Sequence, residues 1–265
     1  MKLLARIFSL LLIASLFVAC GDDDDNEVAP EPTFEDASLE FSAQNPPVEI
    51  PSGLQQADDP NAAAISGQLQ LVNSLSTGFA SFFEVPEGAT RSTTPINTSG
   101  RVDATQNNVV VYTYTSTFQD PETGETSTYT VAYQITDLGT DFFLELFFQF
   151  DGGEYFKFLE GQESKGQLRN GYLEIYYTAF DGQQSDTPAI TFDWNESSNG
   201  LFEFSYFTEG SSVEIVVNPD NSGSLEAFEG GSLYFSATWN AEGTAGTYAY
   251  YDGSGNATDS GNWPS

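Results

Sequence analysis

Asp-Phe-Phe-Leu-Glu-Leu-Phe-Phe-Gln-Phe, residues 141–150, is the stretch that decides the fold class. Successive side chains of a β-strand point to opposite faces, so residues two apart share a face. One face of this stretch is apolar throughout, and two more phenylalanines lie on the other face. The apolar face carries Phe142, Leu144, Leu146, Phe148 and Phe150, and the opposite face carries Phe143 and Phe147. This pattern predicts a strand in the interior of a β-sheet.

Similar segments, rich in β-branched and aromatic residues, surround this stretch and are separated by short runs of turn residues. No helical pattern interrupts them, so consecutive strands are expected to pair antiparallel. The predicted fold is mainly β, an antiparallel meander that forms a barrel or half-barrel, with a two-sheet sandwich as the alternative. The predicted strands are 109–118, 127–136, 141–150, 154–160, 171–180, 189–195, 201–208, 212–217, 224–229, 232–239 and 245–251.

One amphipathic helix is predicted before the strands, over residues 60–83. Asp59 is a suitable N-cap, and Pro60 suits the first helical position. Apolar residues then recur at helical spacings, at Ile65, Leu69, Val72, Phe79 and Phe83. We expect this helix to cover the mouth or the concave face of the sheet.

The remaining N-terminal region predicts a signal peptide and a tether. Residues 1–19 combine two basic residues, an apolar stretch from 7 to 18 and Ala19 directly before Cys20, as secretory signals do. Residues 20–55 are acidic and contain several prolines, which predicts an extended tether. Residues 56–265 are then expected to form a single domain of one helix and an antiparallel sheet.

Phe17-Val18-Ala19-Cys20 resembles the lipobox of bacterial lipoproteins, although Phe17 stands where leucine is usual. The run Asp22-Asp23-Asp24-Asp25 that follows resembles the acidic export signal of Bacteroidetes-type surface lipoproteins. These resemblances cover residues 1–25 only. They imply that Cys20 carries the lipid and that the protein is anchored in the outer membrane, facing the cell exterior.

The composition restricts the partners. The chain has 39 acidic and 7 basic residues, a formal net charge of −32. A charge of this sign repels nucleic acid and anionic membrane surfaces, so we expect no nucleic acid partner and contact with the membrane through the lipid anchor alone. Self-repulsion of this size is relieved by salt, which indicates a saline habitat.

The chain has no histidine and one cysteine, so it cannot build a Ser-His-Asp or Cys-His nucleophile or a zinc site of the usual kind. Carboxylate chemistry is the remaining route to catalysis, and a glycosidase would need two suitably spaced acids. Glu160 with Glu163 and Asp193 with Glu196 are sequence pairs of that kind. A chain with this many acids contains such pairs by chance, and we predict no enzymatic activity.

Residues 218–229 resemble a twelve-residue calcium loop, with oxygen side chains at alternate positions and Gly223 at the sharp turn. Asn218 stands where aspartate is usual, and the flanking segments are predicted strands, so an ordinary hairpin turn is the alternative. No cofactor other than calcium is predicted. The predicted ligands are Asn218, Asp220, Ser222, Ser224 and Glu229.

The aromatic content, 22 Phe, 13 Tyr and 3 Trp, exceeds what a small core needs. Tyr172, Tyr176, Tyr234 and Tyr251 are predicted to point outward, where they could form a platform for sugar rings. The leading functional hypothesis is a lipid-anchored, exported binding or structural protein of the cell envelope, whose small-molecule, glycan or protein partner the sequence does not identify. The alternatives are a carrier of a lipid or other apolar ligand in a half-barrel, and a carbohydrate-binding or glycoside-acting surface protein.

Overall fold

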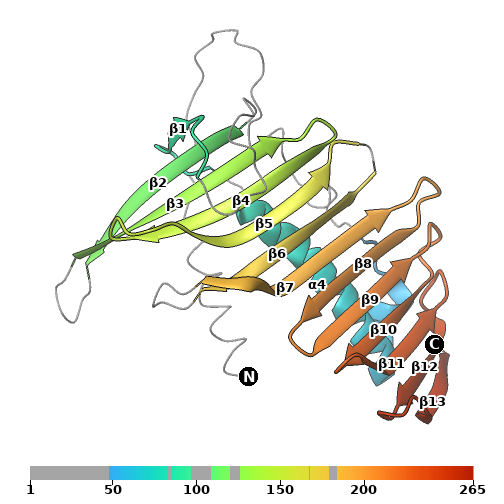
Figure 1. Ribbon diagram of the computed structural model, residues 1–265. Coiled ribbons are helices and arrows are strands. Elements are labelled where there is room, and N and C mark those ends of the chain that lie inside the picture. The colour runs from blue at the N-terminus through green and yellow to red at the C-terminus, as the bar shows by residue number, and fades with distance from the viewer. Residues whose placement is uncertain are drawn as a thin grey trace. The chain divides into compact units, whose positions relative to one another are not determined.

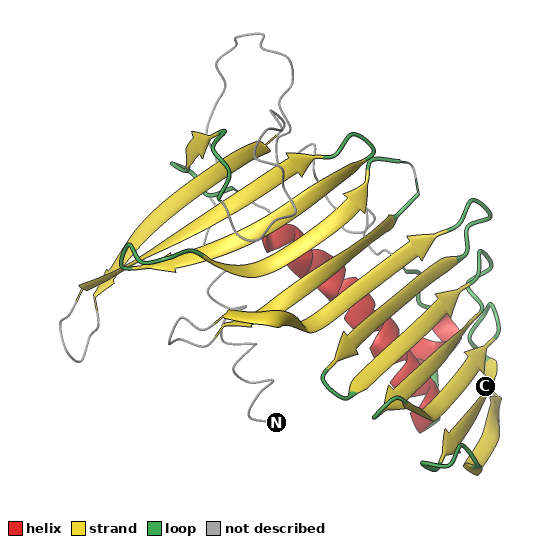
Figure 2. Ribbon diagram, in the orientation of Figure 1, coloured by secondary structure: helices red, strands yellow, loops and turns green. Residues whose placement is uncertain are grey.

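The computed structural model describes residues 48–82, 85–96, 109–119, 126–166, 168–178 and 184–264. In these residues the chain is mainly β, with two helices and thirteen strands (Figures 1 and 2). The predicted signal peptide, Cys20 and the acidic run lie outside the described residues. Among the described helices, none is both long enough and apolar enough to cross a membrane.

The elements match the predicted ones closely. The helices are α3 (Ser52–Gln56) and α4 (Pro60–Phe82). The strands are β1 (Thr90–Ser92), β2 (Val109–Gln119), β3 (Thr126–Asp137), β4 (Asp141–Phe150), β5 (Phe156–Ser164), β6 (Asn170–Thr178), β7 (Gln184–Glu196), β8 (Phe202–Thr208), β9 (Ser211–Val217), β10 (Gly223–Glu229), β11 (Ser232–Trp239), β12 (Ala245–Tyr251) and β13 (Ala257–Pro264). The predicted strands correspond to β2–β12, and the predicted helix is α4. The sequence did not predict β1, β13 or α3.

The strands form one sheet in which each strand pairs with its neighbours in sequence, from β1 to β13. The described registers, such as those of β2 with β3 and β9 with β10, are antiparallel. The predicted antiparallel meander is therefore confirmed. β1 and β13 have one neighbour each, so the sheet is open rather than closed into a barrel. An open sheet is compatible with the predicted half-barrel or with the sandwich.

The single domain predicted over 56–265 divides into two compact units. Unit 1 includes Gly78–Glu160, with β1–β4 and the first half of β5. Unit 2 includes Glu40–Thr77, Gly161–Tyr177 and Ser185–Ser265, with α3, most of α4 and the later strands. Val48 and Leu54, which the sequence places in the tether, are buried in unit 2.

In unit 1 the middles of β3 and β4 are buried on both faces. One face contains a core of Val109, Val111, Ala132 and Phe147, against which Ile96 and Tyr155 pack. The opposite face buries residues such as Ile135 and Leu144. Burial of both faces explains why this part of the sequence is a nearly continuous apolar run instead of a simple alternation.

In unit 2 the strands are buried on one face only. β8–β11 alternate between buried and exposed residues, and the buried face includes Phe204, Ile215 and Trp239. α4 crosses this face (Figure 2), and side-chain hydrogen bonds join Tyr206 to Gln68 and Tyr250 to Asn61. We call this covered side the inner face and the other side the outer face.

The sequence explains why α4 begins and lies where it does. The Asp59 carboxylate accepts hydrogen bonds from the N–H groups of Asn61 and Ala62, at 2.8 and 3.3 Å, so the predicted N-cap is confirmed. Ile65, Leu69 and Val72 are buried and share one helical face. The core of unit 2 is therefore filled by the chain's own helix.

Candidate functional site

The residues of the predicted calcium loop lie at the β9–β10 hairpin and along β10. The turn joins Asn218, Asp220 and Ser222 through short hydrogen bonds, including one from the Ser222 hydroxyl to Asp220 at 2.6 Å. Ser224 lies on β10, and Glu229 is the last residue of that strand, at its other end. The structure thus brings three of the five predicted ligands together and separates Glu229 from them.

These contacts are those of an ordinary turn. Asn221 adopts a left-handed conformation with φ of 68°, and Asn218 closes the hairpin with Ser222. No group of three acidic, histidine or cysteine side chains that could hold a metal is found in the described part of the chain. Calcium binding stays a prediction, and of its five predicted ligands the turn brings together Asn218, Asp220 and Ser222.

The two acid pairs named from the sequence have different surroundings. Glu160 and Glu163 are both buried, each with 2% of its surface exposed. Asp193 and Glu196 point to opposite faces of β7: Asp193 pairs with Ser205 on the outer face, whereas Glu196 pairs with Phe202, a residue of the inner face. The second pair is therefore not assembled as a catalytic pair.

Unit 1 contains a buried charge network that the sequence reasoning missed. The Lys157 ammonium lies 3.0 Å from Oε1 of Glu145 and 2.5 Å from Oε2 of Glu160. Gln134 donates to Oε2 of Glu145 at 2.6 Å and accepts the N–H of Ile96 at 2.7 Å. These four side chains are all buried. The network therefore links three strands and the segment after β1.

The pKa values of this network follow from burial and mutual charge. Burial raises the pKa of the Glu145 carboxyl, and the neighbouring Lys157 opposes part of this rise. Burial alone would lower the pKa of Lys157, but its hydrogen bond to Glu160 and the charge of Glu145 raise it above the ordinary value. Lys157 is thus a cation that neutralises buried carboxylates.

Two carboxylates bound to one ammonium have the closeness that glycosidase chemistry needs. Glu145 and Glu160, however, are 5% and 2% exposed and are neutralised by Lys157. A substrate could not reach them without opening the core of unit 1. One signal in the sequence could have found the network: two consecutive strands each place a charge of opposite sign between apolar neighbours, Glu145 between Leu144 and Leu146 and Lys157 between Phe156 and Phe158.

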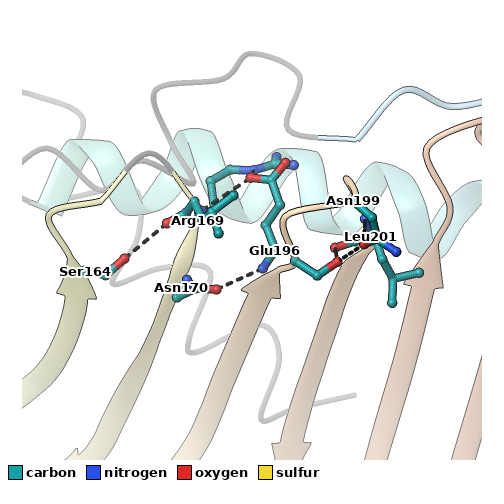
Figure 3. Close-up of polar contacts among 8 residues, drawn as sticks. Ser164, Arg169, Asn170, Glu196, Asn199 and Leu201 are labelled. Carbon is teal, nitrogen blue, oxygen red and sulfur yellow. Dashed lines mark hydrogen bonds and ion pairs between the residues drawn. The ribbon is translucent and has the colours of Figure 1, made fainter.

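A second ion pair, partly buried, lies in unit 2, where β6 begins and β7 ends. Nε of Arg169 donates to Oε2 of Glu196 at 2.8 Å, and the two side chains point toward each other (Figure 3). The N–H of Glu196 donates to the Arg169 carbonyl at 2.8 Å and to Oδ1 of Asn170 at 3.0 Å. The guanidinium also lies 4.4 Å from the ring centre of Phe202. Each partner is thus held by several contacts.

The hydrogen bond from Arg169 lowers the pKa of Glu196, and burial opposes this only in part. Glu196 is therefore ionised at neutral pH and committed to Arg169. This pair joins the ends of two strands to the turn before β8, and we assign it a structural role. The sequence did not identify Arg169, although a single arginine before a strand start, with no later basic residue, is a signal that could have been used.

Two phenylalanines form an apolar patch on the outer face of unit 2. Phe207 on β8 is 40% exposed. Phe228 lies two strands away, on β10, and Leu233 of β11 pairs with it. A bulge in the β10–β11 pairing sets Tyr234 beside Phe235 and opposite Ala227, on the inner face, where burial and then Tyr234 raise the pKa of Tyr206. We call Phe207, Phe228 and Leu233 the aromatic patch.

The registers define the layout of the patch. Ser212 on β9 pairs with both Phe207 and Phe228. The two phenylalanines therefore flank a small polar residue, with their strands about 10 Å apart. A sheet position between two rings, with no large side chain of its own, can accept a flat or elongated group from a partner.

A row of carboxylates runs beside the patch. Glu214 on β9 pairs directly with Glu226 on β10, and both are exposed. Asp193 lies in the same cross-strand row, separated from Glu214 by Ser205. Glu226 is two residues from Phe228 on β10, and Glu214 is two residues from Ser212 on β9, each about 7 Å along the strand. We call Asp193, Glu214 and Glu226 the carboxylate row.

The tyrosines predicted to form a platform do not gather in one place. Tyr234 lies on the inner side of β11, near Tyr206, whereas the Tyr251 hydroxyl lies 3.1 Å from that of Ser236 on the neighbouring strand. Tyr172 and Tyr176 lie on β6, where the Tyr176 hydroxyl donates to Glu174. The sequence reasoning thus identified no residue of the patch, because it named only tyrosines as outward aromatic residues.

No protein-family model matches this chain, and no curated protein has a similar sequence.

Proposed function

We propose that this protein is a lipid-anchored, exported binding protein of the outer membrane, facing the cell exterior, and that it has no catalytic activity. The anchor and location are inferred from residues 1–25, with Cys20 as the lipidated residue. The binding function is supported by one observation above all. The aromatic patch is exposed on the outer face of unit 2, although the inner face is already filled by α4.

The absence of catalysis is supported by the environment of the acids. Glu145 and Glu160 are buried and neutralised by Lys157, and Asp193 and Glu196 point to opposite faces. A carrier of an apolar ligand is a weaker candidate for unit 2, because Ile65 and Leu69 of α4 occupy its inner face. A retained lipid-sized mass in native mass spectrometry of the purified chain would favour that carrier over our proposal.

Anchoring is tested on intact cells. A clickable palmitate analogue should label the wild-type chain, and external protease should remove it from the cell surface. The Cys20→Ser variant should lose the label and should not be retained in the outer membrane fraction. An unlabelled wild-type chain, or one that external protease spares while cleaving a known surface protein, would contradict the proposed anchoring or location.

Binding can be tested without knowing the ligand. Hydroxyl-radical footprinting of intact cells should protect Phe207 and Phe228 relative to the purified chain. Phe118 and Leu138, which are exposed on unit 1, provide internal controls that should be modified equally in both samples. Equal modification of the patch and of the controls in both samples would show that the patch is unoccupied on cells.

A further inference from the structure

The charge around the aromatic patch indicates the chemistry of its partner. We propose that the aromatic patch and the carboxylate row together bind cationic side chains, arginine above all, of a partner polypeptide. This proposal rests on the binding function proposed above and adds the partner's chemical class to it.

The centre of the proposed site is Ser212. It is flanked across the sheet by Phe207 and Phe228, and Glu214 follows two residues later on the same strand and face. A guanidinium above Ser212 would lie beside two aromatic rings and within reach of Glu214 and Glu226. Arginine stacks on rings and forms paired hydrogen bonds with carboxylates, so one side chain can use both features.

The strands that carry these carboxylates supply no compensating charge of their own. Glu214 and Glu226 are directly opposite each other on neighbouring strands, and like charges in that position destabilise a sheet. No lysine or arginine follows Arg169 in the sequence, and Arg169 is committed to Glu196. β7–β13 therefore contain no cation of their own, and a cation from a partner would relieve the repulsion.

The same features favour a polypeptide over a glycan. Phe207, Phe228 and Leu233 offer no hydrogen-bonding group to a sugar hydroxyl. The three tryptophans, the strongest sugar-stacking side chains, are all buried, at 2–4% exposure. An apolar patch beside carboxylates is instead complementary to a segment that combines arginine with apolar residues.

The test uses the full chain, purified in a neutral detergent, and a fluorescent peptide with arginines spaced by Gly and Ser. A matched peptide carries neutral citrulline at each arginine position. Binding is measured by fluorescence anisotropy at moderate salt for Phe207→Leu, Phe228→Leu and the double variant Glu214→Gln/Glu226→Gln. Phe118→Leu and Glu87→Gln/Glu154→Gln make the same chemical changes at exposed positions of unit 1. Circular dichroism confirms that each variant is folded.

The arginine peptide should bind, and the citrulline peptide should bind at least tenfold more weakly. Each Phe→Leu change in the patch should weaken arginine binding about two- to fivefold, the effect of losing a cation–π contact of about 0.5–1 kcal/mol at an exposed site. The glutamine double variant should weaken binding further, and more strongly at low salt. The unit 1 controls should leave binding within about twofold of wild type.

Equal losses of peptide affinity in the patch variants and in the unit 1 controls would show that the peptide is attracted only by the overall negative charge of the chain. That result would overturn the proposal. Equal binding of the two peptides would overturn it as well. A different result would assign the patch to glycans. In that case a neutral oligosaccharide such as cellohexaose would bind the wild-type chain and bind Phe207→Leu more weakly, and the arginine peptide would not bind. None of these binding measurements depends on the lipidation of Cys20 or on the footprinting of intact cells. A failure of the proposed function would therefore appear in those two experiments and not in this one.

Discussion

Lys157 shows how a single side chain can support a buried cluster of acids. Its ammonium contacts Glu145 and Glu160 in the interior of unit 1, where Gln134 also donates to Glu145. Removing one member of a buried ion network leaves uncompensated charge, which costs about 3–5 kcal/mol. We therefore expect Lys157→Met to lower the free energy of unfolding of unit 1 by about that amount at neutral pH, as measured by urea denaturation.

The pH dependence of this variant distinguishes charge from packing. Without the ammonium, the pKa of Glu145 should rise further, so lowering the pH should protonate the acid and restore part of the lost stability. Lys165→Met, at an exposed turn residue, is the matched control and should change stability by less than about 1 kcal/mol. A loss at Lys157 that is equal at every pH would assign the effect to packing alone.

The ion pair of Glu196 with Arg169 also gives a pH-dependent contribution to stability, for a different reason. The pKa of Glu196 in the folded state is lowered, mainly by the hydrogen bond from Arg169. The stability from its ionised form is therefore fully present above the ordinary glutamate pKa and is lost as the pH falls through the lowered value. Glu196→Gln should cost about 1.5–3 kcal/mol at neutral pH, and the difference from wild type should shrink in acid. Urea denaturation across this pH range would refute the assignment if the difference were constant.

At the scale of elements, tryptophans packed over glycines join several strand pairs of unit 2. Trp239 lies opposite Gly223, and Trp263 lies opposite Gly246. A methyl group added to either glycine would come within 2.3 Å of the facing indole. Trp194 packs over Gly171 in the same way, so all three tryptophans of the chain cover a glycine. Glycine in these strands provides space for a ring rather than conformational freedom.

The pair of Gly246 and Trp263 holds the edge strand β13 against β12. Gly246→Ala would place Cβ 2.0 Å from Trp263 and 2.2 Å from the Thr238 carbonyl, so the indole must move. Overpacking of this kind costs about 1–3 kcal/mol. We expect lower stability and a change in tryptophan fluorescence. Gly253→Ala, at a turn where an added methyl meets nothing within 4 Å, should be close to wild type. Equal effects at the two glycines would show that the Trp263 contact is unimportant.

The same elements show why some strands were predictable and others were not. β2–β12 carry β-branched and aromatic residues at alternate positions, which is a local signal that the sequence contains. β13 reads Ala-Thr-Asp-Ser-Gly-Asn-Trp-Pro and is a strand because Trp263 packs over Gly246, a contact between separate strands. α3 is likewise fixed by distant contacts, such as the hydrogen bond from Gly53 to the Glu242 carbonyl at 3.0 Å.

The candidate site was less predictable than the fold for a related reason. Alternation alone places Tyr234 on the outer face, whereas the bulge in the β10–β11 pairing turns it to the inner face. The patch residues Phe207 and Phe228 resemble core residues in sequence. Their grouping depends on two strand registers that both meet at Ser212. Register is set by turn geometry and by side-chain packing across strands, and neither is visible in a single segment.

At the scale of the whole molecule, the dominant property is charge. The chain has a formal net charge of −32, and its few basic residues include Lys157 and Arg169, which are buried in ion pairs. These cations therefore do little to reduce the charge presented to solvent. Repulsion among like charges opposes the compact state, and dissolved salt reduces it by shortening the screening length from about 30 Å at 10 mM to about 10 Å at 100 mM.

We therefore expect the folded chain to be more stable in saline than in dilute buffer, with the urea midpoint rising steeply between about 10 and 500 mM sodium chloride and then levelling off. Screening depends on ionic strength, whereas the exclusion of solutes from protein surface depends on the identity of the ion and continues to molar concentration. Sodium chloride and sodium sulfate at equal ionic strength should therefore give the same rise at the low end. A midpoint that does not change with salt would show that the acidic side chains are far enough apart to tolerate one another, and it would remove the basis for a saline habitat.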